Sequence, residues 1–229
     1  MTMPFTIKEF FSVFIAYNAA IWPAQIIAYI LGMVAVSALF MERPLSSRLI
    51  LAILALMWAW NGIGYHFLFF SRINPAAIVF AGLFVLQALL LAACAVAGPG
   101  VWFRMGRDFR SLVGYAVIVN AMLIYPMQSI DAGHGLMAGP MFGVTPCPTT
   151  IFTIGMLMLA RGRWVLWLSV IPFLWSLIGL AAAVQLGMSE DLGLPIAGVA
   201  LVLMIAAEMF RVLYNRGTFA TSIGNSETL

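Results

Sequence analysis

Long apolar runs, separated by short polar breaks, dominate the pattern of this chain. The runs cover residues 19–41, 49–70, 76–98, 112–127, 147–160, 164–186 and 194–214. A helix needs roughly 20 apolar residues to cross the hydrocarbon core of a bilayer, and most of the runs reach that length. The breaks contain charged residues, glycine or proline, which favour turns. The pattern predicts an all-α fold, a polytopic membrane helix bundle of about seven transmembrane helices in one domain over residues 1–229.

The fourth and fifth runs are short, and they flank a segment rich in glycine and proline at residues 128–146. This segment is too long and too apolar for an ordinary exposed loop. Irregular backbone at membrane depth needs protein or a water-filled cavity beside it. We therefore expect residues 128–146 to form a re-entrant segment at the outer end of the bundle and to complete the two short spans.

The two ends of the chain have patterns of their own. Residues 4–18 combine the charged pair Lys8 and Glu9 with Phe5, Phe10, Phe11 and Phe14. This pattern predicts an interfacial helix whose aromatic side chains face lipid while the charged pair faces water. At the other end, residues 217–229 form a short polar tail.

Composition agrees with the membrane prediction. The chain is 64% hydrophobic and only 8% charged, and its mean hydropathy is +1.06. A soluble domain carries charge on roughly a quarter of its residues. The exterior of this chain is therefore expected to face the lipid bilayer rather than water.

Basic residues divide unevenly between the two sides of a seven-span topology. One side holds Arg43, Arg48, Arg104, Arg107, Arg110, Arg161, Arg163, Arg211 and Arg216, and the other holds Lys8 and Arg72. Because basic residues concentrate on the cytoplasmic side, this predicts an external N-terminus and a cytoplasmic C-terminus in the inner or plasma membrane. The net charge of +3 follows this topology, so we expect contact with anionic headgroups and no nucleic-acid partner.

Polar and aromatic residues collect at the predicted outer end, where they suggest a vestibule for a small solute, ion or lipid. These residues are Asn18, Trp22, Gln25, Trp58, Asn61, Tyr65, His66, Tyr125 and Gln128. Asn18, Trp22 and Gln25 are spaced to share one helical face, and so are Trp58, Asn61 and Tyr65. Pro23 is expected to kink the first helix or to mark its first turn. Glycines 62 and 64 would let another helix or a ligand approach the backbone closely.

A metal site is one reading of the remaining polar residues. His66, Asp131, His134 and Cys147 are ligand types that soft or borderline ions accept. No CxxC, HxxxH or HExxH spacing supports that reading. Cys147 could instead be a reactive thiol at a helix N-terminus, or the same helix end could hold an anion on its free N–H groups. The third alternative is that the segment around Cys147 simply begins a helix. A retinal Schiff base is excluded, because the only lysine is Lys8.

Other intramembrane polar residues have structural interpretations. Gln87 and Asn120 are expected to form hydrogen bonds between helices. Glu208 lies three residues before Arg211, which predicts an ion pair within one helix. A disulfide between Cys94 and Cys147 is not expected, because the two are predicted at opposite ends of their spans.

Three motifs carry a family resemblance. YNAAIWPAQ, WAWNGIGYHFLFF followed by INPAA, and FGVTPCPTT together resemble a family of bacterial seven-helix integral membrane proteins catalogued only as a domain of unknown function. The resemblance covers most of the chain and implies the same topology. It brings no catalytic residue, substrate or cofactor.

Three functions agree with these features. The first is a transporter or channel-like permease for a small solute or ion, with an outward-facing polar vestibule. The second is an intramembrane, metal-dependent enzyme that acts on a lipid at the outer leaflet. The third is a non-catalytic sensor or partner subunit, and in each case the bundle could act alone or as a homo-oligomer.

Overall fold

The computed structural model is all-helical, apart from one two-residue strand pair, and describes residues 4–41, 43–98, 100–133 and 135–226. The longer helices are α1 (Ile7–Ile21), α2 (Ala24–Leu39), α3 (Pro44–Trp60), α4 (Ala77–Ala97), α5 (Phe109–Val119), α8 (Pro146–Leu159), α9 (Val165–Leu186) and α10 (Gly193–Ser226). Shorter helical segments are the π-helices η1 (Asn61–Phe67) and η3 (Asn120–Ile124), the α-helices α6 (Tyr125–Asp131) and α7 (Gly135–Ala138), and the 3₁₀ turns η2 (Phe70–Arg72) and η4 (Ser189–Leu192). Strands β1 (Trp102–Phe103) and β2 (Ala160–Arg161) form an antiparallel pair.

Four helical segments of the described chain are long and apolar enough to cross a membrane, namely Pro44–Arg72, Ala77–Ala97, Phe109–Asp131 and Val165–Gln185. The pair α1 and α2, bent by 81°, would make a fifth. Helix α8 and the apolar part of α10, Gly193–Glu208, are shorter than the spanning length. The molecule is thus a helical bundle of membrane-protein character. By length alone it has four or five spans, where the apolar runs predict about seven.

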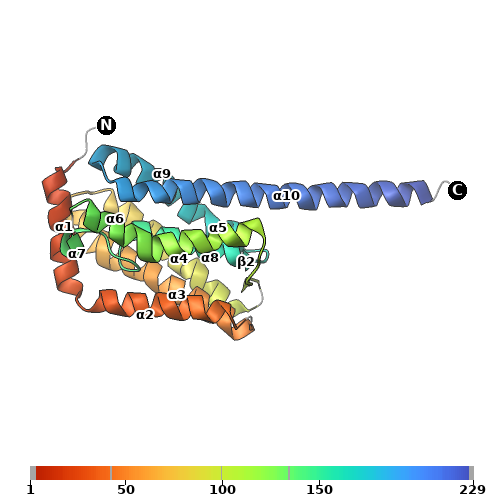
Figure 1. Cartoon of the computed structure of the whole chain (residues 1–229), viewed down its shortest axis with the longest axis horizontal. Coiled ribbons are helices and arrows are strands. Elements are labelled where there is room, and N and C mark those ends of the chain that lie inside the picture. Colours follow the sequence, from red (N-terminus) through yellow and green to blue (C-terminus); the bar gives the residue numbers. More distant parts are fainter. Residues whose placement is uncertain (1–3, 42, 99, 134, 227–229) are drawn as a thin grey trace.

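The bundle has two different ends, which Figure 1 separates clearly. At one end, hereafter the α1 end, helix α1 lies across the other helices instead of alongside them. At the opposite end, hereafter the hairpin end, Trp102 pairs with Arg161 and Phe103 with Ala160. Helix α10 continues past the hairpin end of the bundle (Figure 1).

Helix α1 begins and ends at features that the sequence encodes directly. The side chain of Thr6 accepts a hydrogen bond from the N–H of Glu9 (3.2 Å), and the Glu9 carboxylate accepts one from the N–H of Thr6 (2.7 Å). This reciprocal capping box satisfies two of the free donors at a helix start. The helix ends at Ile21 because Pro23 cannot continue it, which confirms the break expected there.

Two phenylalanines of α1 correct a prediction. Phe10 and Phe14 are buried, although the sequence pattern placed them against lipid. Their rings contact Phe70 and Tyr65, with centroids 6.0 Å apart for Phe10 and Phe70 and 5.3 Å for Phe14 and Tyr65. They face protein because α1 lies over the end of the bundle, so its apolar side covers other helices.

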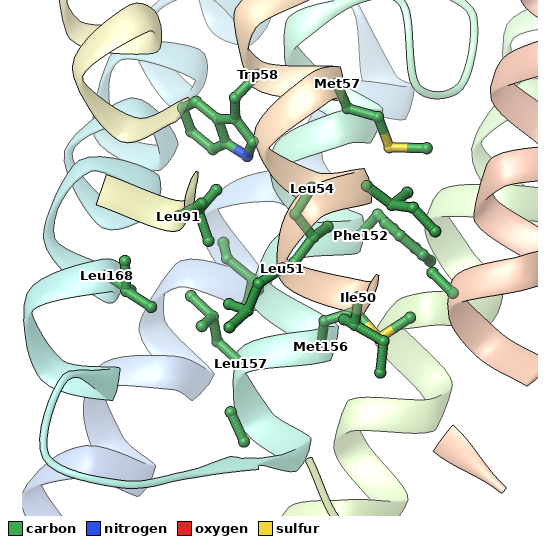
Figure 2. Packing of buried hydrophobic residues seen from close by; sticks show 14 of the residues in the cluster. Ile50, Leu51, Leu54, Met57, Trp58, Leu91, Phe152, Met156, Leu157 and Leu168 are labelled. Carbon is green, nitrogen blue, oxygen red and sulfur yellow. The ribbon is translucent and has the colours of Figure 1, made fainter. Parts of the chain in front are cut away.

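Helix α8 is the centre of the fold. It contacts α3, α5, α9 and α10, and every side chain from Pro148 to Leu159 is buried. Figure 2 shows this packing, in which one face of α3 meets side chains of α4, α8 and α9; the labelled residues are Ile50, Leu51, Leu54, Met57, Trp58, Leu91, Phe152, Met156, Leu157 and Leu168. With 14 residues, α8 is about 21 Å long, less than the roughly 30 Å of a bilayer core.

One glycine explains how closely the helices approach near η1. A Cβ atom on Gly62 would lie 3.0 Å from Val85 Cγ2 and 3.1 Å from the Ala81 carbonyl oxygen on α4. Only glycine allows this separation without displacing the neighbouring helix. The close helix approach expected at Gly62 is therefore confirmed.

Candidate functional site

A cavity of about 210 Å³ lies at the α1 end, and we call it the aromatic cavity. Its aromatic lining consists of Phe5, Phe10, Phe14, Tyr65, Phe70, Phe80 and Trp175. Its polar lining consists of His66, Asn74, Cys147, Gln185 and Asp191. These residues come from α1, η1, η2, α4, α8, α9 and η4, together with the turns beside them, so the cavity exists only in the folded bundle.

The π-helix η1 brings Tyr65 and His66 to this cavity. The regular helix α3 gives way to η1 at Asn61, whose side-chain amide donates to the carbonyl oxygens of Met57 (2.8 Å) and Gly143 (3.2 Å). A π-helical turn holds an extra residue and therefore rotates the side chains that follow it; such turns are frequent at functional sites.

His66 is the most unusual residue of the cavity. It is 1% exposed and lies among aromatic rings, with its centroid 4.7 Å from that of Phe84 and 5.1 Å from that of Trp175. Among the residues that the structure describes, neither ring nitrogen of His66 has a hydrogen-bond partner, and nor does Nε1 of Trp175. Leaving a buried polar atom unpaired costs about 1–3 kcal/mol, and the described residues leave that cost uncompensated at these three atoms.

Asp191 supplies the carboxylate of the cavity. It is buried, and its Oδ1 accepts a hydrogen bond from the Tyr125 hydroxyl (2.5 Å). Tyr125 is fully buried and does not line the cavity itself. Tyr125 thus orients the carboxylate of a residue that lines the cavity.

The start of α8 forms another part of the cavity lining through Pro146 and Cys147. Helix α8 begins with Pro146, Cys147 and Pro148, so two of its first three positions have no N–H group. This removes donors that a helix start buried in an apolar region could not satisfy. Only Cys147 keeps an N–H there, which weakens the anion-binding reading of this segment and favours the helix-start reading.

Threonine side chains at the start of α8 and along it make further polar contacts. The hydroxyls of Thr145, Thr149 and Thr153 donate to the carbonyls four residues earlier, at 2.7, 2.7 and 2.8 Å. The hydroxyl oxygens of the last two also accept hydrogen bonds, from Asn61 Nδ2 of η1 (3.2 Å) and from Trp58 Nε1 of α3 (2.9 Å) respectively. Asn61 and Trp58 therefore join η1 and α3 to α8.

The irregular segment before α8, residues 139–145, is buried apart from the partly exposed Met141. It is tied to α1: the Tyr17 hydroxyl donates to the Val144 carbonyl (2.5 Å), and Asn18 Nδ2 donates to the Gly139 carbonyl (3.0 Å). Protein thus surrounds this irregular backbone, as it must in an apolar environment.

The structure distributes the predicted vestibule residues over several environments. Tyr65 and His66 line the cavity; Trp58, Asn61 and Tyr125 are buried and do not line it; Asn18 and Gln25 are buried at the α1–α2 break; Trp22 and Gln128 are exposed. The common helical face predicted for Asn18, Trp22 and Gln25 is wrong, because the chain turns by 81° between α1 and α2. Across this turn Gln25 Nε2 donates to the Asn18 carbonyl (2.9 Å), while Trp22 is 63% exposed.

The predicted metal ligands are also separated. His66 and Cys147 line the aromatic cavity, Asp131 is exposed, and His134 lies outside the described residues. Within the described ranges, no three His, Cys, Asp or Glu side chains come together in a way that could hold a metal ion.

Sequence reasoning missed Trp175 and Asp191 as cavity residues. Trp175 lies inside a long apolar run, where the sequence does not distinguish it from a residue that only packs against other helices. Asp191 lies in the charged segment between two apolar runs. In α9, Pro172 was the available sequence signal of an interrupted helix. A proline inside a helix leaves the carbonyl oxygen four residues before it without its backbone hydrogen bond. Gln87 of α4 donates to that carbonyl, at Leu168 (2.8 Å), which confirms its predicted role between helices.

The hairpin end is held by charged groups. Arg110 pairs with Glu208, and its Nη2 donates to the carbonyls of Leu157 (3.2 Å) and Ala160 (3.0 Å), where α8 ends. Glu208 thus pairs with Arg110 of another helix, because α5 and α10 both pack on α8 at this level; the side chain of Arg211, its predicted partner, lies outside what the structure describes. The interhelical bond predicted for Asn120 is not formed among the described residues, where its Oδ1 has no partner.

A second ion pair lies beside the first, between Arg161 and Asp108 (3.3 Å). Asp108 caps α5 and accepts a hydrogen bond from the Ser111 N–H (2.8 Å). The nearby Ser111 hydroxyl and this N–H, followed by Arg161 and Arg110, hold the pKa of the Asp108 carboxyl below its ordinary value of 3.8. Of the two Ser111 groups, only the N–H meets hydrogen-bond geometry.

Comparison with known proteins places the chain in a family but assigns no activity. Neither the curated proteins nor the solved structures gave a significant match. The family model described as "Family of unknown function (DUF6064)" matches residues 7–216, nearly the whole chain. This confirms the resemblance carried by the three motifs, and the chain therefore belongs to the DUF6064 family.

Proposed function

We propose that this protein is a permease for a small, uncharged heteroaromatic solute that binds in the aromatic cavity from outside the cell. The observation that carries the proposal is the buried His66, which lines the cavity and whose two ring nitrogens have no hydrogen-bond partner among the described residues. A neutral imidazole offers one donor and one acceptor, which suits a ring molecule with polar atoms on its edge.

Size and charge narrow the class of solute. An apolar cavity of about 150 Å³ is known to accept benzene, so about 210 Å³ suits a one-ring or small two-ring molecule. Aromatic walls favour a flat ring through stacked and edge-on contacts. No lysine or arginine is among the described lining residues, and Asp191 would oppose an anion, so an uncharged solute fits best.

Transport is supported by where the helices are interrupted. Helix α3 changes to η1, α5 changes to η3, and α8 begins after a buried irregular segment. Interrupted helices of this kind form substrate sites in many transporters. In our proposal the α1–α2 pair, α8 with the segment before it, and α10 complete seven crossings. The arginines at the hairpin end favour a cytoplasmic location for that end.

Helix α1 would act as the outer cover of the cavity. It contributes Phe10 and Phe14 to the lining, and Tyr17 and Asn18 bond the segment at residues 139–145. Trp60 Nε1 donates to the Tyr17 hydroxyl (2.9 Å) and so holds the same contact from the side. Breaking these few hydrogen bonds would let α1 move and admit the solute.

The test combines stability, binding and uptake. Thermal unfolding of the purified protein in detergent is measured with uracil, nicotinamide and indole, and with benzoate as a charged comparison; radiolabelled uracil or nicotinamide uptake follows in proteoliposomes. We expect an uncharged ring compound to raise the melting temperature and to accumulate. His66→Phe should abolish both effects and stabilise the unliganded protein by about 1 kcal/mol, because it removes unpaired polar atoms.

Ser169→Ala is the matched control, since Ser169 is buried on α9 outside the cavity and bonds only its own helix, at the Val165 carbonyl (2.7 Å). It should bind and take up the solute as the wild type does. Binding without uptake would overturn transport and leave a sensor. Unchanged uptake in His66→Phe would overturn the site itself.

A further inference from the structure

Two cavities adjoin each other at the hairpin end, remote from the aromatic cavity. One, of about 500 Å³, is lined by Arg43, Ser47, Arg48 and Arg104, among others. The other, of about 650 Å³, is lined mainly by apolar residues of α4 and by Trp164, with Arg163 beside that tryptophan. Gly98 and Trp102 line both cavities, so the two are neighbours, and together we call them the hairpin groove.

The first half of the hairpin groove carries uncompensated positive charge. Arg43 and Arg48 come from the start of α3, and Arg104 follows β1. Within the described ranges none of these three arginines forms an ion pair, whereas Arg110 and Arg161 at the same end do. Even if Glu42, which lies outside the described residues, is counted beside them, the sum is +2. Such a cluster at a membrane surface attracts an anion.

The second half has the shape and chemistry for a hydrocarbon chain. Leu90, Ala93, Cys94 and Ala97 recur at helical spacing on one face of α4, and three of them are small. Trp102 and Trp164, 49% and 43% exposed, stand at the side of this face. Tryptophan prefers the level where headgroups meet acyl chains, so it marks the expected depth of the boundary between the two halves.

We propose that the hairpin groove is a binding site for one anionic phospholipid. The phosphate binds Arg43, Arg48 and Arg104, and an acyl chain lies along Ala93, Cys94 and Ala97 of α4. Trp102 lies between the two parts. The charge of the first half selects an anionic over a zwitterionic lipid, and the apolar second half selects a lipid over a free phosphate. The inference is independent of the solute that occupies the aromatic cavity.

Brominated lipids test the proposal on the intact protein, because bromine on an acyl chain quenches tryptophan at short range. The protein is reconstituted in phosphatidylcholine vesicles, and dibromo-phosphatidylglycerol or dibromo-phosphatidylcholine is titrated in. We expect stronger quenching by the brominated phosphatidylglycerol at equal mole fraction. The preference should disappear in Trp102→Phe/Trp164→Phe, which places the chain beside those two rings.

Arginine variants measure the headgroup contribution. Each basic residue near the surface contributes about fivefold in affinity for an anionic lipid, so Arg48→Gln/Arg104→Gln should weaken the preference about 20-fold. Arg72→Gln is the matched control: Arg72 lies at the α1 end, stacked on Phe69 with its Cζ 4.9 Å from the ring centroid, and its loss should change nothing. An equal loss in the control would mean general charge attraction and overturn a specific site.

Filling the groove separates lipid from phosphate. Ala93→Phe should reduce the preference for brominated phosphatidylglycerol while the three arginines remain. Added glycerol phosphate at millimolar concentration should fail to displace the lipid. Complete displacement by glycerol phosphate, or normal lipid preference in Ala93→Phe, would overturn the proposal, because the apolar half would then contribute nothing.

Discussion

Helix α8 starts among prolines and aromatic rings at the α1 end and finishes among arginines at the hairpin end. At its start, Pro146 and Pro148 remove backbone donors, and threonine hydroxyls bond carbonyls within the same helix. At its finish, Arg110 and Arg161 donate to the last carbonyls. Both arrangements serve a helix that is buried along almost its whole length.

The two ends differ in the polar groups that surround α8 and the aromatic cavity. At the hairpin end, Arg110, Asp108, Arg161 and Glu208 form ion pairs, and the two arginines also bond carbonyls, which supports a structural role for these four residues; Arg43, Arg48 and Arg104 at the same end form no ion pair among the described residues. At the α1 end, His66 keeps unpaired nitrogens inside a cavity. An unpaired polar group retained at some expense of stability is what a binding site requires, because the ligand completes it.

The largest loss of stability is expected for a variant that disrupts the hairpin end. Arg110→Met removes the partner of Glu208 and the donor to the end of α8, while most of the apolar side chain remains. We expect a loss of about 3 kcal/mol in the free energy of unfolding, measured by detergent-denaturant titration, because charged hydrogen bonds to a buried helix end are lost. Arg107→Met, exposed and without an ion pair among the described residues, should stay within about 0.5 kcal/mol. Equal effects in the two variants would contradict the capping role.

The next effect tests close packing at the α1 end. Gly62→Leu places a side chain where even a Cβ atom would lie 3.0 Å from Val85, so η1 and α4 must separate. We expect a loss of about 2 kcal/mol and weaker solute binding, because the backbone that carries His66 shifts. Gly82→Leu is the control on α4, since a Cβ there meets nothing within 4 Å; it should leave the protein equally stable or slightly more stable. A neutral Gly62→Leu would show that η1 tolerates displacement.

A smaller difference in stability is expected between variants of two prolines that occupy the same helical position. Pro146→Ala adds an N–H group to the buried start of α8, whereas Pro44→Ala adds one to the exposed start of α3. We expect Pro146→Ala to lose about 2 kcal/mol, from the unpaired donor and the added freedom of the unfolded chain. Pro44→Ala should lose about 0.5 kcal/mol, from the second cause alone. Thermal unfolding of both variants measures the difference; equal losses would mean that the buried N–H finds a partner.

The smallest effect is a pH dependence at the hairpin end. The pKa of Asp108 is lowered in the folded protein, so its contribution to stability is complete above its ordinary pKa of 3.8 and is lost as the pH falls through the folded value. Asp108→Asn keeps a capping side chain for Ser111 but cannot titrate. The melting temperature of the wild type should therefore fall more steeply than that of Asp108→Asn below about pH 4. Parallel curves for the two proteins would contradict this assignment.

The hydrophobic pattern predicted the helical class and the membrane character well, since both depend on composition and on the length of apolar runs. It predicted individual local events too. Pro23 ends a helix, Gly62 allows a close approach, and Gln87 bonds a neighbouring helix, because each rests on the chemistry of one residue. It failed where an element changes direction: the 81° turn after α1 moved Phe10 and Phe14 from lipid to protein.

The sequence by itself determined that this chain is apolar, helical and asymmetric in charge, because these properties belong to the residues taken singly or in short windows. Only the tertiary structure decided which polar residues meet. His66 and Trp175 are far apart in the chain but line one cavity, and Arg110 pairs with Glu208 although 98 residues separate them. Contacts between distant segments depend on how helices cross and bend, and a short stretch of amino-acid sequence does not determine that geometry.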